Sequence, residues 1–328
     1  MDPISHGVLG SGWSQAAARR DKRLPAAVLG SLSAIAPDLD ILIRSSTDPL
    51  LFLEYHRHFT HALAFAPLGA LACAALLHVW ARAHLAFRQT YVFCLLGYAS
   101  HGLLDACTIY GTELFWPFTD YRVAWSIVSA IDPAFTLPSL VLVVFALRRR
   151  RRSYAWAAVS WAFAYLVFGM IQQQRAEAAG AAFARERGHM PLRLEAKPAL
   201  GTVLVWKVIY EHDGRYYVDG VRVAFGAQVY PGESIAKLDV GRDFPWLDAA
   251  SRRAGDIERF RRIADDFLGF DPTTGLIVDI RYSMVPNEIA GFWGIALDPN
   301  ASRDAHAEFV ATVDTTPADA LRLVEMIF

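Results

Sequence analysis

The chain has 328 residues, of which 54% are hydrophobic and 20% are charged, and its formal net charge at pH 7 is −1. A composition this apolar is unusual for a soluble protein. The near-zero net charge argues against a general nucleic-acid binder, so no nucleic-acid partner is expected. Residues 1–171 alternate apolar runs with short basic clusters, whereas residues 172–328 hold most of the acidic side chains.

The first half of the chain contains several segments that could cross a bilayer, which requires about 20 mostly apolar residues in a helix. In chain order these predicted spans are 24–43, 60–80, 89–109, 125–147 and 153–171. Residues 3–18 form a shorter sixth candidate, either a marginal span or a helix that lies in the interface. We therefore predict a multi-pass α-helical membrane domain of five to six spans over residues 1–171.

Basic residues in short connections indicate how the spans are oriented, because such connections stay in the cytoplasm. The three strongly basic connections are RRDKR (19–23), the loop with Arg82 and Arg88, and RRRRR (148–152). Counting the spans places all three on the same face of the membrane. We predict that this face is cytoplasmic, so the last span leads outward and residues 172–328 lie outside the cytoplasm.

Ionisable side chains gather at the outer level of these predicted spans. Each costs about 2.5–3.5 kcal/mol to insert, so a group of them indicates a function. A single member has simpler explanations, such as a satisfied interfacial histidine, but the group converges on one depth from four or five separate segments. The candidate metal ligands are His6, Asp38, Asp40, His56, His61, His101, Asp105 and Asp132.

The spacing of these residues suits metal ligation. His101 and Asp105 are four residues apart, which places an imidazole and a carboxylate on one helix face. Asp38 and Asp40 are two residues apart, so a regular helix would separate them. Either the helix ends or is distorted near Pro37 and both carboxylates face inward, or one is a ligand and the other orients a histidine.

A set of imidazoles and carboxylates without thiolates is typical of a hydrolytic site for a divalent metal, with zinc favoured and manganese or iron as alternatives. The candidates exceed the needs of one tetrahedral ion, so we expect either two ions or one ion and a general base. The catalytic roles are assigned to Asp40, Asp105 and His56. Arg57 and Arg122, near the same level, are candidate substrate-binding residues for an anionic phosphate, or else interfacial arginines.

Five blocks of sequence resemble, in the same order, the bacterial inner-membrane, metal-dependent hydrolases of YdjM type. They are MDPISHGVLG, APDLDIL, HRHFTHAL, GYASHGLLDACTIYGTELFWPFTD and IDPAFTLP, which together cover roughly residues 1–147. The resemblance implies an inner-membrane location and a hydrolase distantly similar to zinc-dependent phospholipase C. The family's polar motif residues correspond to His6, Asp38, Asp40, His56, His61, His101 and Asp105, while Asp132 is our addition. The chain departs from the pattern at His58, where a glycine or another small residue is expected.

Beyond a helical linker at 172–188, residues 189–328 are predicted to form a small α+β extramembrane domain, mainly antiparallel. GRYYVDGVRVAF alternates as a strand does and follows the turn signal HDG at 212–214, which predicts a β-hairpin. VLVWKVIYE, GLIVDIRYSM, FWGIALD and AEFVATVD supply further strands, and DAASRRAGDIERFRRIADDFLGF has helical spacing. No catalytic cluster is evident in this domain, so substrate gating, partner binding and simple packing are its alternative roles.

We predict a hydrolase of the bacterial inner membrane whose metal-activated water attacks a phosphoester or acyl bond, with the polar domain in the periplasm. The depth of the candidate site indicates a lipid or lipid-linked substrate, whose head group lies at that level. One alternative is a transporter or channel that uses the histidines and aspartates as a proton relay, although the candidates lie on one side of the membrane only. Another alternative is a metal-binding membrane protein without turnover.

Overall fold

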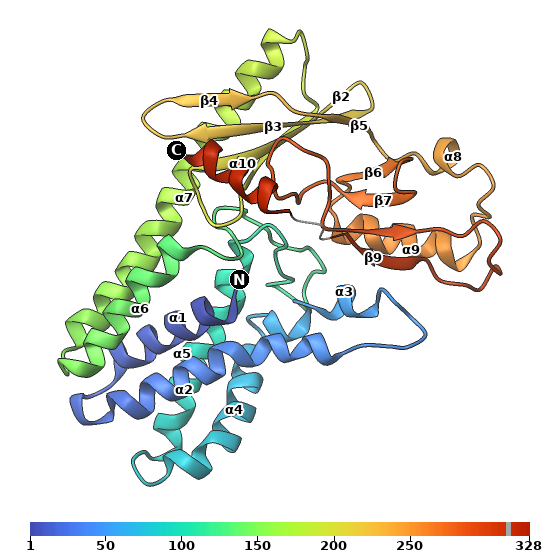
Figure 1. The fold of residues 1–328 in the computed structure, drawn as a ribbon. Coiled ribbons are helices and arrows are strands. Elements are labelled where there is room, and N and C mark those ends of the chain that lie inside the picture. Colours follow the sequence, from blue (N-terminus) through green and yellow to red (C-terminus); the bar gives the residue numbers. More distant parts are fainter. Residues whose placement is uncertain (313–315) are drawn as a thin grey trace. The chain divides into compact units, whose positions relative to one another are not determined.

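The computed structural model describes residues 1–312 and 316–328, and the chain divides into two compact units (Figure 1). The helical unit consists of Met1–Leu42, Tyr55–Met170 and Leu200–Thr202. The sheet unit consists of Ile43–Glu54, Ile171–Ala199 and Val203–Phe328. A short segment between the first two predicted spans thus belongs to the sheet unit, which the sequence analysis does not anticipate.

The helical unit contains α-helices joined by short 3-10 helices. The α-helices are α1 (Pro3–Ala17), α2 (Arg23–Ile35), α4 (Ala66–Ala81), α5 (Phe87–Ala106), α6 (Pro133–Arg148) and the first part of α7 (Arg152–Glu186). The 3-10 helices are η1 (Arg20–Lys22), η2 (Ala36–Leu42) and η3 (Phe59–His61), and the short helix α3 (Leu51–Tyr55) precedes η3. Asp2 and Asp132 cap α1 and α6, each followed by a proline in the first turn.

Among the residues that the structure describes, two helical stretches are long and apolar enough to cross a membrane, Arg20–Leu42 and Arg152–Glu186. Leu51–His61 and Ala66–Ala81, which meet at an angle of 85°, would make a third if they form one broken span. The predicted span 60–80 is therefore interrupted, and α6, with 16 residues, reaches only about 24 Å. The structure supports a membrane-spanning helical region but does not confirm five to six spans.

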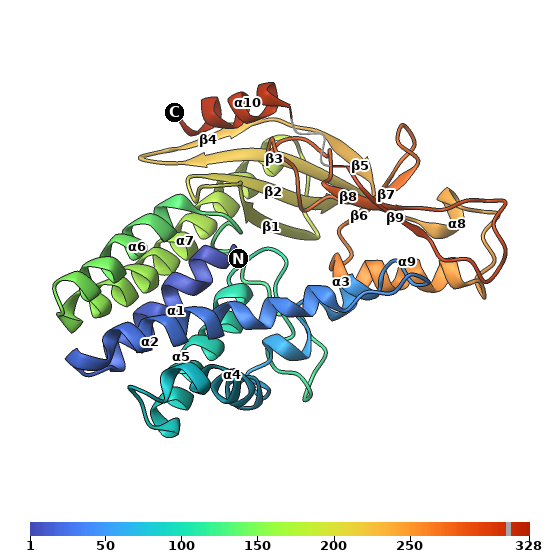
Figure 2. The same cartoon turned by 60° about the horizontal axis from the view of Figure 1, so that its bottom comes forward.

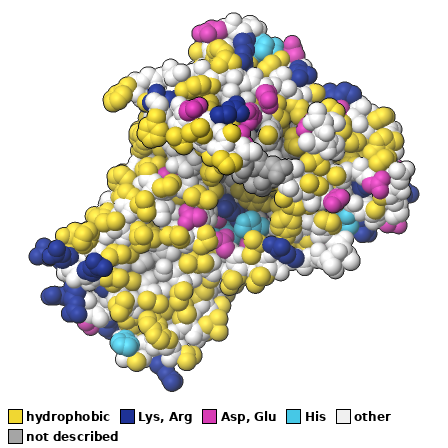
Figure 3. Space-filling model, viewed as in Figure 1, with side chains coloured by type: hydrophobic (Ala, Val, Ile, Leu, Met, Phe, Trp, Pro, Cys, Tyr) yellow, Lys and Arg dark blue, Asp and Glu magenta, His cyan; other side chains and the backbone are white. Residues whose placement is uncertain are grey.

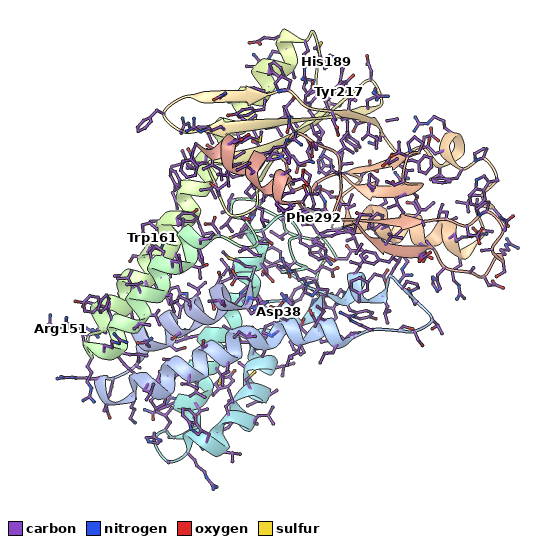
Figure 4. The ribbon with its side chains drawn as sticks, viewed as in Figure 1. Asp38, Arg151, Trp161, His189, Tyr217 and Phe292 are labelled. Atoms are coloured by element: carbon purple, nitrogen blue, oxygen red, sulfur yellow. The ribbon has the colours of Figure 1, made fainter. Side chains whose placement is uncertain are left out.

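The surface of the helical unit is mainly hydrophobic, as expected of helices in contact with lipid (Figure 3). Exposed arginines gather at one end of this unit, where the basic connections 19–23 and 148–152 lie close together (Figures 1 and 2). Arg151 lies at this basic end, and Asp38 lies toward the opposite end of the unit (Figure 4). The helices thus separate the basic connections from the level of the candidate ligands.

Helices α1, α2 and α5 cross at small residues, which lets their backbones approach closely. A Cβ added at Gly97 of α5 would lie 2.2 Å from the carbonyl oxygen of Gly30 in α2. One added at Gly10 of α1 would lie 2.4 Å from the same oxygen. Ser14 of α1 also donates to the backbone oxygen of Phe93 in α5 at 3.0 Å. This close crossing brings η2 and the start of α1 beside α5.

Over the described ranges 1–312 and 316–328, two antiparallel sheets form the framework of the sheet unit. The first has the order β1 (Arg193–Pro198), β2 (Val205–His212), β3 (Arg215–Val223) and β4 (Ala227–Tyr230), with β5 (Ser234–Ala236) also paired to β3. The second has the order β6 (Leu268–Asp271), β7 (Leu276–Asp279), β8 (Trp293–Ala296) and β9 (Glu308–Ala311). The sheet unit also contains the second part of α7 and the helices α8 (Val240–Asp243), α9 (Arg252–Ile263) and α10 (Pro317–Ile327).

The predicted hairpin is confirmed by the pairing of His212 with Arg215. Asp213 and Gly214 between them both have positive φ, as the two-residue turn requires. The two sheets share a buried core whose members are Ile209, Tyr216, Val218, Phe267, Leu276, Val278 and Ile280. Helix α7 is continuous, so the predicted linker 172–188 is largely the second part of one long helix rather than a separate element.

Candidate metal centre

Four of the predicted ligands meet inside the helical unit. They are Asp38 in η2, His61 in η3, and His101 and Asp105 in α5. One nitrogen or oxygen atom of each lies within 4.8 Å of those of the other three. The side chains of both histidines and of Asp105 are fully buried, whereas that of Asp38 is 23% exposed. The cluster is therefore accessible on the side of Asp38, which Figure 4 labels.

The spacing of the four ligand atoms fits one tetrahedral divalent ion. Ligand atoms about 2.1 Å from such an ion lie about 3.4 Å from one another. Nε2 of His61 lies 2.8 Å from Nε2 of His101, and both nitrogens lie 3.2 Å from Oδ2 of Asp105. Oδ1 of Asp38 lies 3.6 Å from Nε2 of His61 and 3.4 Å from that of His101. Small side-chain shifts would bring all four to coordination distance.

The outer nitrogens of both histidines are held by neighbouring groups, which directs the inner nitrogens toward the cluster. Nδ1 of His101 lies 2.5 Å from the backbone oxygen of Ala34, which can only accept, so this nitrogen carries the proton. Nδ1 of His61 lies 2.9 Å from Oγ1 of Thr60 and 3.2 Å from Oδ2 of Asp40. The neutral imidazoles then present lone pairs at Nε2, as metal-ligating histidines with an anchored second nitrogen do.

The inner atoms of the cluster are poorly supplied with the hydrogen bonds that buried polar groups normally make, since among the described residues the two Nε2 atoms have only each other and Oδ2 of Asp105 has none. The lone pairs of His61 and His101, with nitrogens 2.8 Å apart, repel each other unless a proton or a cation lies between them. Oδ2 of Asp105 is buried and makes no hydrogen bond to any residue that the structure describes, although three nitrogens lie near it. A divalent cation would satisfy these atoms together, so the residues fit the predicted metal.

Two local features bring the ligands together. The 3-10 helix η2 follows α2, so Asp38 and Asp40 both face histidines although they are two residues apart. Gly102 follows His101 in α5, and a Cβ there would lie 2.1 Å from the backbone oxygen of His61. Because glycine has no Cβ, η3 can approach α5 closely enough for the two imidazoles to meet.

Asp40 orients side chains around the cluster. Its Oδ1 lies 2.9 Å from Nδ1 of His56. Its Oδ2 accepts the backbone N–H of Arg57 at 2.9 Å and the hydroxyl of Thr60 at 2.8 Å, beside Nδ1 of His61. The carboxylate thus holds Nδ1–H of both histidines. In the half-buried His56, Nε2 is then the nitrogen that can take up a proton.

His6 adjoins the cluster without being one of its four donors. Its ring stacks on His101 with the centroids 3.7 Å apart, and its Nε2 lies 3.2 Å from Oδ1 of Asp105. Nδ1 of His6 is buried and makes no hydrogen bond within the described part of the chain. The structure therefore places the predicted ligand His6 next to His101 and Asp105, outside the group of four donors.

Two arginines flank the ring of Tyr110 next to the cluster. The guanidinium carbons of Arg57 and Arg122 lie 5.4 and 4.8 Å from its centroid. Nε of Arg57 is 3.2 Å from Oδ2 of Asp105, and both terminal nitrogens of Arg122 are 3.4 Å from the backbone oxygen of His56. Arg57 has a φ of 63°, and its backbone is held there because its N–H donates to Asp40 and its C=O accepts from the hydroxyl of Thr112. Backbone strain of this kind is typical of functional sites.

The structure does not bring Asp132 to the cluster. Both of its carboxylate oxygens accept from the hydroxyl of Tyr165, and Oδ1 also accepts two backbone N–H groups at the start of α6. Asp132 therefore caps a helix and links it to α7, in place of the ligand role predicted for it. His58, where the chain departs from the family pattern, pairs with Glu113 at 3.1 Å.

Sequence reasoning missed the groups that hold the ligands and Arg57. The hydroxyl of Thr60 contacts both Asp40 and His61, and Thr108 accepts from Arg57 at 2.8 Å. Both threonines lie inside the blocks that carry the family resemblance. A hydroxyl residue next to the charged residues of a motif is a local signal that could have identified them. The backbone oxygen of Ala34 gives no such signal, because every residue supplies a carbonyl.

A mainly apolar helical surface, two to three candidate spans and a buried imidazole–carboxylate cluster define an integral membrane protein with a possible metal-binding site. Residues 1–176 match the family described as YdjM inner membrane protein. The chain therefore belongs to this family and is an inner-membrane protein.

Two known proteins are similar to shorter parts of the chain. Inner membrane protein YbcI of Escherichia coli (strain K12) is 32% identical over 103 residues, which is 30% of this chain and 58% of that protein. Uncharacterized protein YfhP of Bacillus subtilis (strain 168) is 24% identical over 108 residues, 33% of this chain and 32% of that protein. The chain thus spans less than two thirds of either relative. No solved structure matches it.

Proposed function

We propose that this protein is a membrane-bound, metal-dependent hydrolase. The observation that carries the proposal is the convergence of two imidazole nitrogens and two carboxylate oxygens at the spacing of one tetrahedral ion, on His61, His101, Asp38 and Asp105. A divalent metal there, with zinc favoured by the mixed nitrogen and oxygen donors, would lower the pKa of water to about 7 and supply hydroxide as the nucleophile. The partial exposure of Asp38 gives water and substrate a route to this point.

Asp40 and His56 form the proposed general base. The carboxylate of Asp40 holds Nδ1–H of His56 at 2.9 Å, so Nε2 can take a proton from the attacking water and return it to the leaving oxygen. The ring centroids of His56 and His61 are 6.1 Å apart, which keeps the base beside a ligand. Asp105, also predicted to be catalytic, is proposed to act as a ligand through Oδ2.

Arg57 and Arg122 are proposed to hold the anionic group of the substrate, because a guanidinium group can donate two parallel hydrogen bonds to two oxygens of one phosphate. Apolar side chains next to Asp38 face outward, with Leu39 63% and Leu42 75% exposed. An alkyl chain can lie against this surface while its head group reaches the cluster. The substrate is therefore proposed to be a phosphoester of a lipid or lipid-linked envelope molecule, with an acyl bond as the alternative.

The membrane arrangement is also part of the proposal. Helices α1, α5 and α6 would complete five to six crossings together with the longer spans, and the sheet unit would lie in the periplasm. The basic connections 19–23 and 148–152 support this orientation, because they share one end of the helical unit and their arginines are largely exposed.

Metal analysis of the full-length protein in detergent tests the proposal. Wild type purified with added zinc or manganese is expected to hold about one ion per chain, and His61→Ala is expected to lose it. His58→Ala is the matched control, because His58 pairs with Glu113 outside the four donors. Wild type without metal would contradict the hydrolase, and proton flux in liposomes would then favour the relay.

Turnover is tested by mass spectrometry of bacterial envelope lipids before and after incubation with the purified protein. His56→Gln is expected to keep its metal and to hydrolyse about 100-fold more slowly, because a general base typically contributes at least that factor. A full rate in this variant would contradict the role of His56. Loss of metal in the same variant would show that His56 is a ligand.

A further inference from the structure

The segment between the two ligand-bearing motifs belongs to the sheet unit. Residues 43–54, here called the linking segment, begin three residues after Asp40 and end two residues before His56. Asp48 orders its turn, since its backbone N–H donates to Oγ of Ser45 at 3.2 Å and its Oδ1 accepts the N–H of Leu50 at 3.0 Å. A contact that holds this segment in place therefore restrains the backbone between the motif with Asp40 and the motif with His56.

One side chain of α9 holds the linking segment. Nε and Nη2 of Arg259 lie 2.7 and 2.9 Å from the two carboxylate oxygens of Glu54. Nη1 and Nη2 lie 3.1 and 2.9 Å from the two oxygens of Asp48. Nη1 also donates to Asp256, about one turn earlier in α9, at 2.8 Å. Three carboxylates thus converge on one guanidinium, two of them through paired hydrogen bonds.

Groups behind Arg259 keep this arrangement in place. Oδ2 of the buried Asp256 accepts Nδ1–H of His306 and the backbone N–H of Ala307, each at 2.9 Å. Phe52 of the linking segment meets Phe309 of β9 edge to face, with the ring centroids 5.1 Å apart. The contact therefore combines partly buried ion pairs with a packed aromatic pair, which makes it stronger than isolated ion pairs at an open surface.

The charges make the contact depend on Arg259. Without its guanidinium, the carboxylates of Asp48, Glu54 and Asp256 would repel one another. The linking segment would then leave α9 and sample many conformations. The ligands on either side of the segment would then be less well preorganised. Part of the free energy of metal binding would be used to order them, so the metal would bind more weakly.

We propose that Arg259 is a positioning residue for the metal centre, through which the sheet unit fixes the linking segment and with it the separation of Asp38 from His61. The inference rests on the proposed metal site. It assigns a task to the C-terminal domain, for which the sequence analysis finds no catalytic cluster. Arg259 acts only through Asp48 and Glu54, and makes none of the ligand contacts itself.

The experiment compares zinc affinity, measured by competition with a chelating dye, and backbone hydrogen exchange in the full-length protein in detergent. Arg259→Ala is expected to weaken zinc binding about tenfold, the lower end of effects seen for groups that orient ligands. Exchange is expected to accelerate in residues 43–54 and to stay unchanged in β1–β4. Adding Asp48→Asn and Glu54→Gln to this variant removes the repulsion and is expected to restore part of the affinity.

Arg261→Ala is the matched control, because Arg261 lies on the same helix and pairs with Glu258 and Asp266 instead of the linking segment. It is expected to leave zinc affinity and the exchange of residues 43–54 unchanged. Equal zinc affinity in wild type and Arg259→Ala would overturn the positioning role, and so would faster exchange throughout the sheet unit. A wild type that binds no zinc would contradict the proposed function itself, so the two failures are distinguishable.

Discussion

Asp38 and Asp40 are two residues apart, yet their carboxylates meet different nitrogens of His61. Asp38 lies 3.6 Å from Nε2, on the side of the cluster, and Asp40 lies 3.2 Å from Nδ1, on the opposite side of the ring. A carboxylate that accepts the second N–H of a histidine fixes the ring and makes the first nitrogen a better ligand. Asp40 should therefore influence metal binding without touching the metal.

Asp40→Asn is expected to lower zinc affinity about 10- to 100-fold in a chelator competition, while the protein still folds. The amide keeps the size of the side chain but loses the charge and one acceptor oxygen, so it orients His56 and His61 less well. Asp132→Asn is the comparison, because Asp132 caps α6 and binds Tyr165. Asp132→Asn should melt at a lower temperature with unchanged zinc affinity. Weaker zinc binding in Asp132→Asn together with unchanged zinc binding in Asp40→Asn would refute both the orienting role of Asp40 and the capping role of Asp132.

Lys207 in β2 is another residue whose surroundings determine its chemistry. Its buried Nζ lies 2.9 Å from Oγ of Ser283 and 2.5 Å from the backbone oxygen of Glu288. Burial lowers the pKa of Lys207 from 10.5 to about 7, against the opposing influence of nearby Asp279. Between these two pH values the unfolded chain holds a proton that the folded chain lacks, so the free energy of unfolding rises with pH.

The melting temperature of the detergent-purified protein should accordingly increase from about pH 7 to about pH 9. Lys207→Met should remove most of this increase, because methionine has no proton to gain on unfolding. The expected slope in the wild type corresponds to at most about 1.4 kcal/mol of unfolding free energy for each pH unit. An undiminished increase in Lys207→Met would mean that another group is responsible.

Among the elements, η2 and η3 have the greatest influence on the site, and both interrupt a span that hydrophobicity alone predicts as one helix. From the sequence, a break near Pro37 is one predicted alternative, and α2 does end at Ile35. No break is predicted within 60–80, but α4 begins only at Ala66. Hydrophobic periodicity cannot detect such breaks, because nearly every residue in these runs is apolar. Pro67, in the first turn of α4, was a local signal for the second break.

Gly102→Ala tests whether the close approach of η3 to α5 is required. The new Cβ would clash with the backbone oxygen of His61, so η3 should move away and most of the bound metal should be lost, as in His61→Ala. Gly12→Ala in α1 is the matched control, because its Cβ would lie 3.6 Å from Val159, an ordinary contact. Equal metal contents in wild type and both variants would show that the approach is not needed.

For the whole molecule, local sequence patterns predict a helical membrane region and an antiparallel sheet domain. They do not predict which distant residues come into contact. The hairpin of β2 and β3 follows from its turn residues. In contrast, the pairing of Arg259 with Glu54 joins positions 205 residues apart and leaves no local signal. The sequence places all candidate ligands at one depth, but depth alone does not separate ligands from helix caps. Asp132 in the motif IDP fits both roles by its sequence, and the structure shows that it caps α6.

The orientation of the whole molecule can be tested with two single cysteines in a variant that lacks the three native ones. The side chain of Asp213, in the β2–β3 turn, is 85% exposed, so Asp213→Cys should react with a membrane-impermeant maleimide in intact spheroplasts. Arg151→Cys, at the basic end of the helical unit, should react only after the membrane is opened. The reverse pattern would place the sheet unit in the cytoplasm. Because Asp38 lies toward the opposite end of the helical unit from Arg151, the same labels decide which leaflet supplies the substrate.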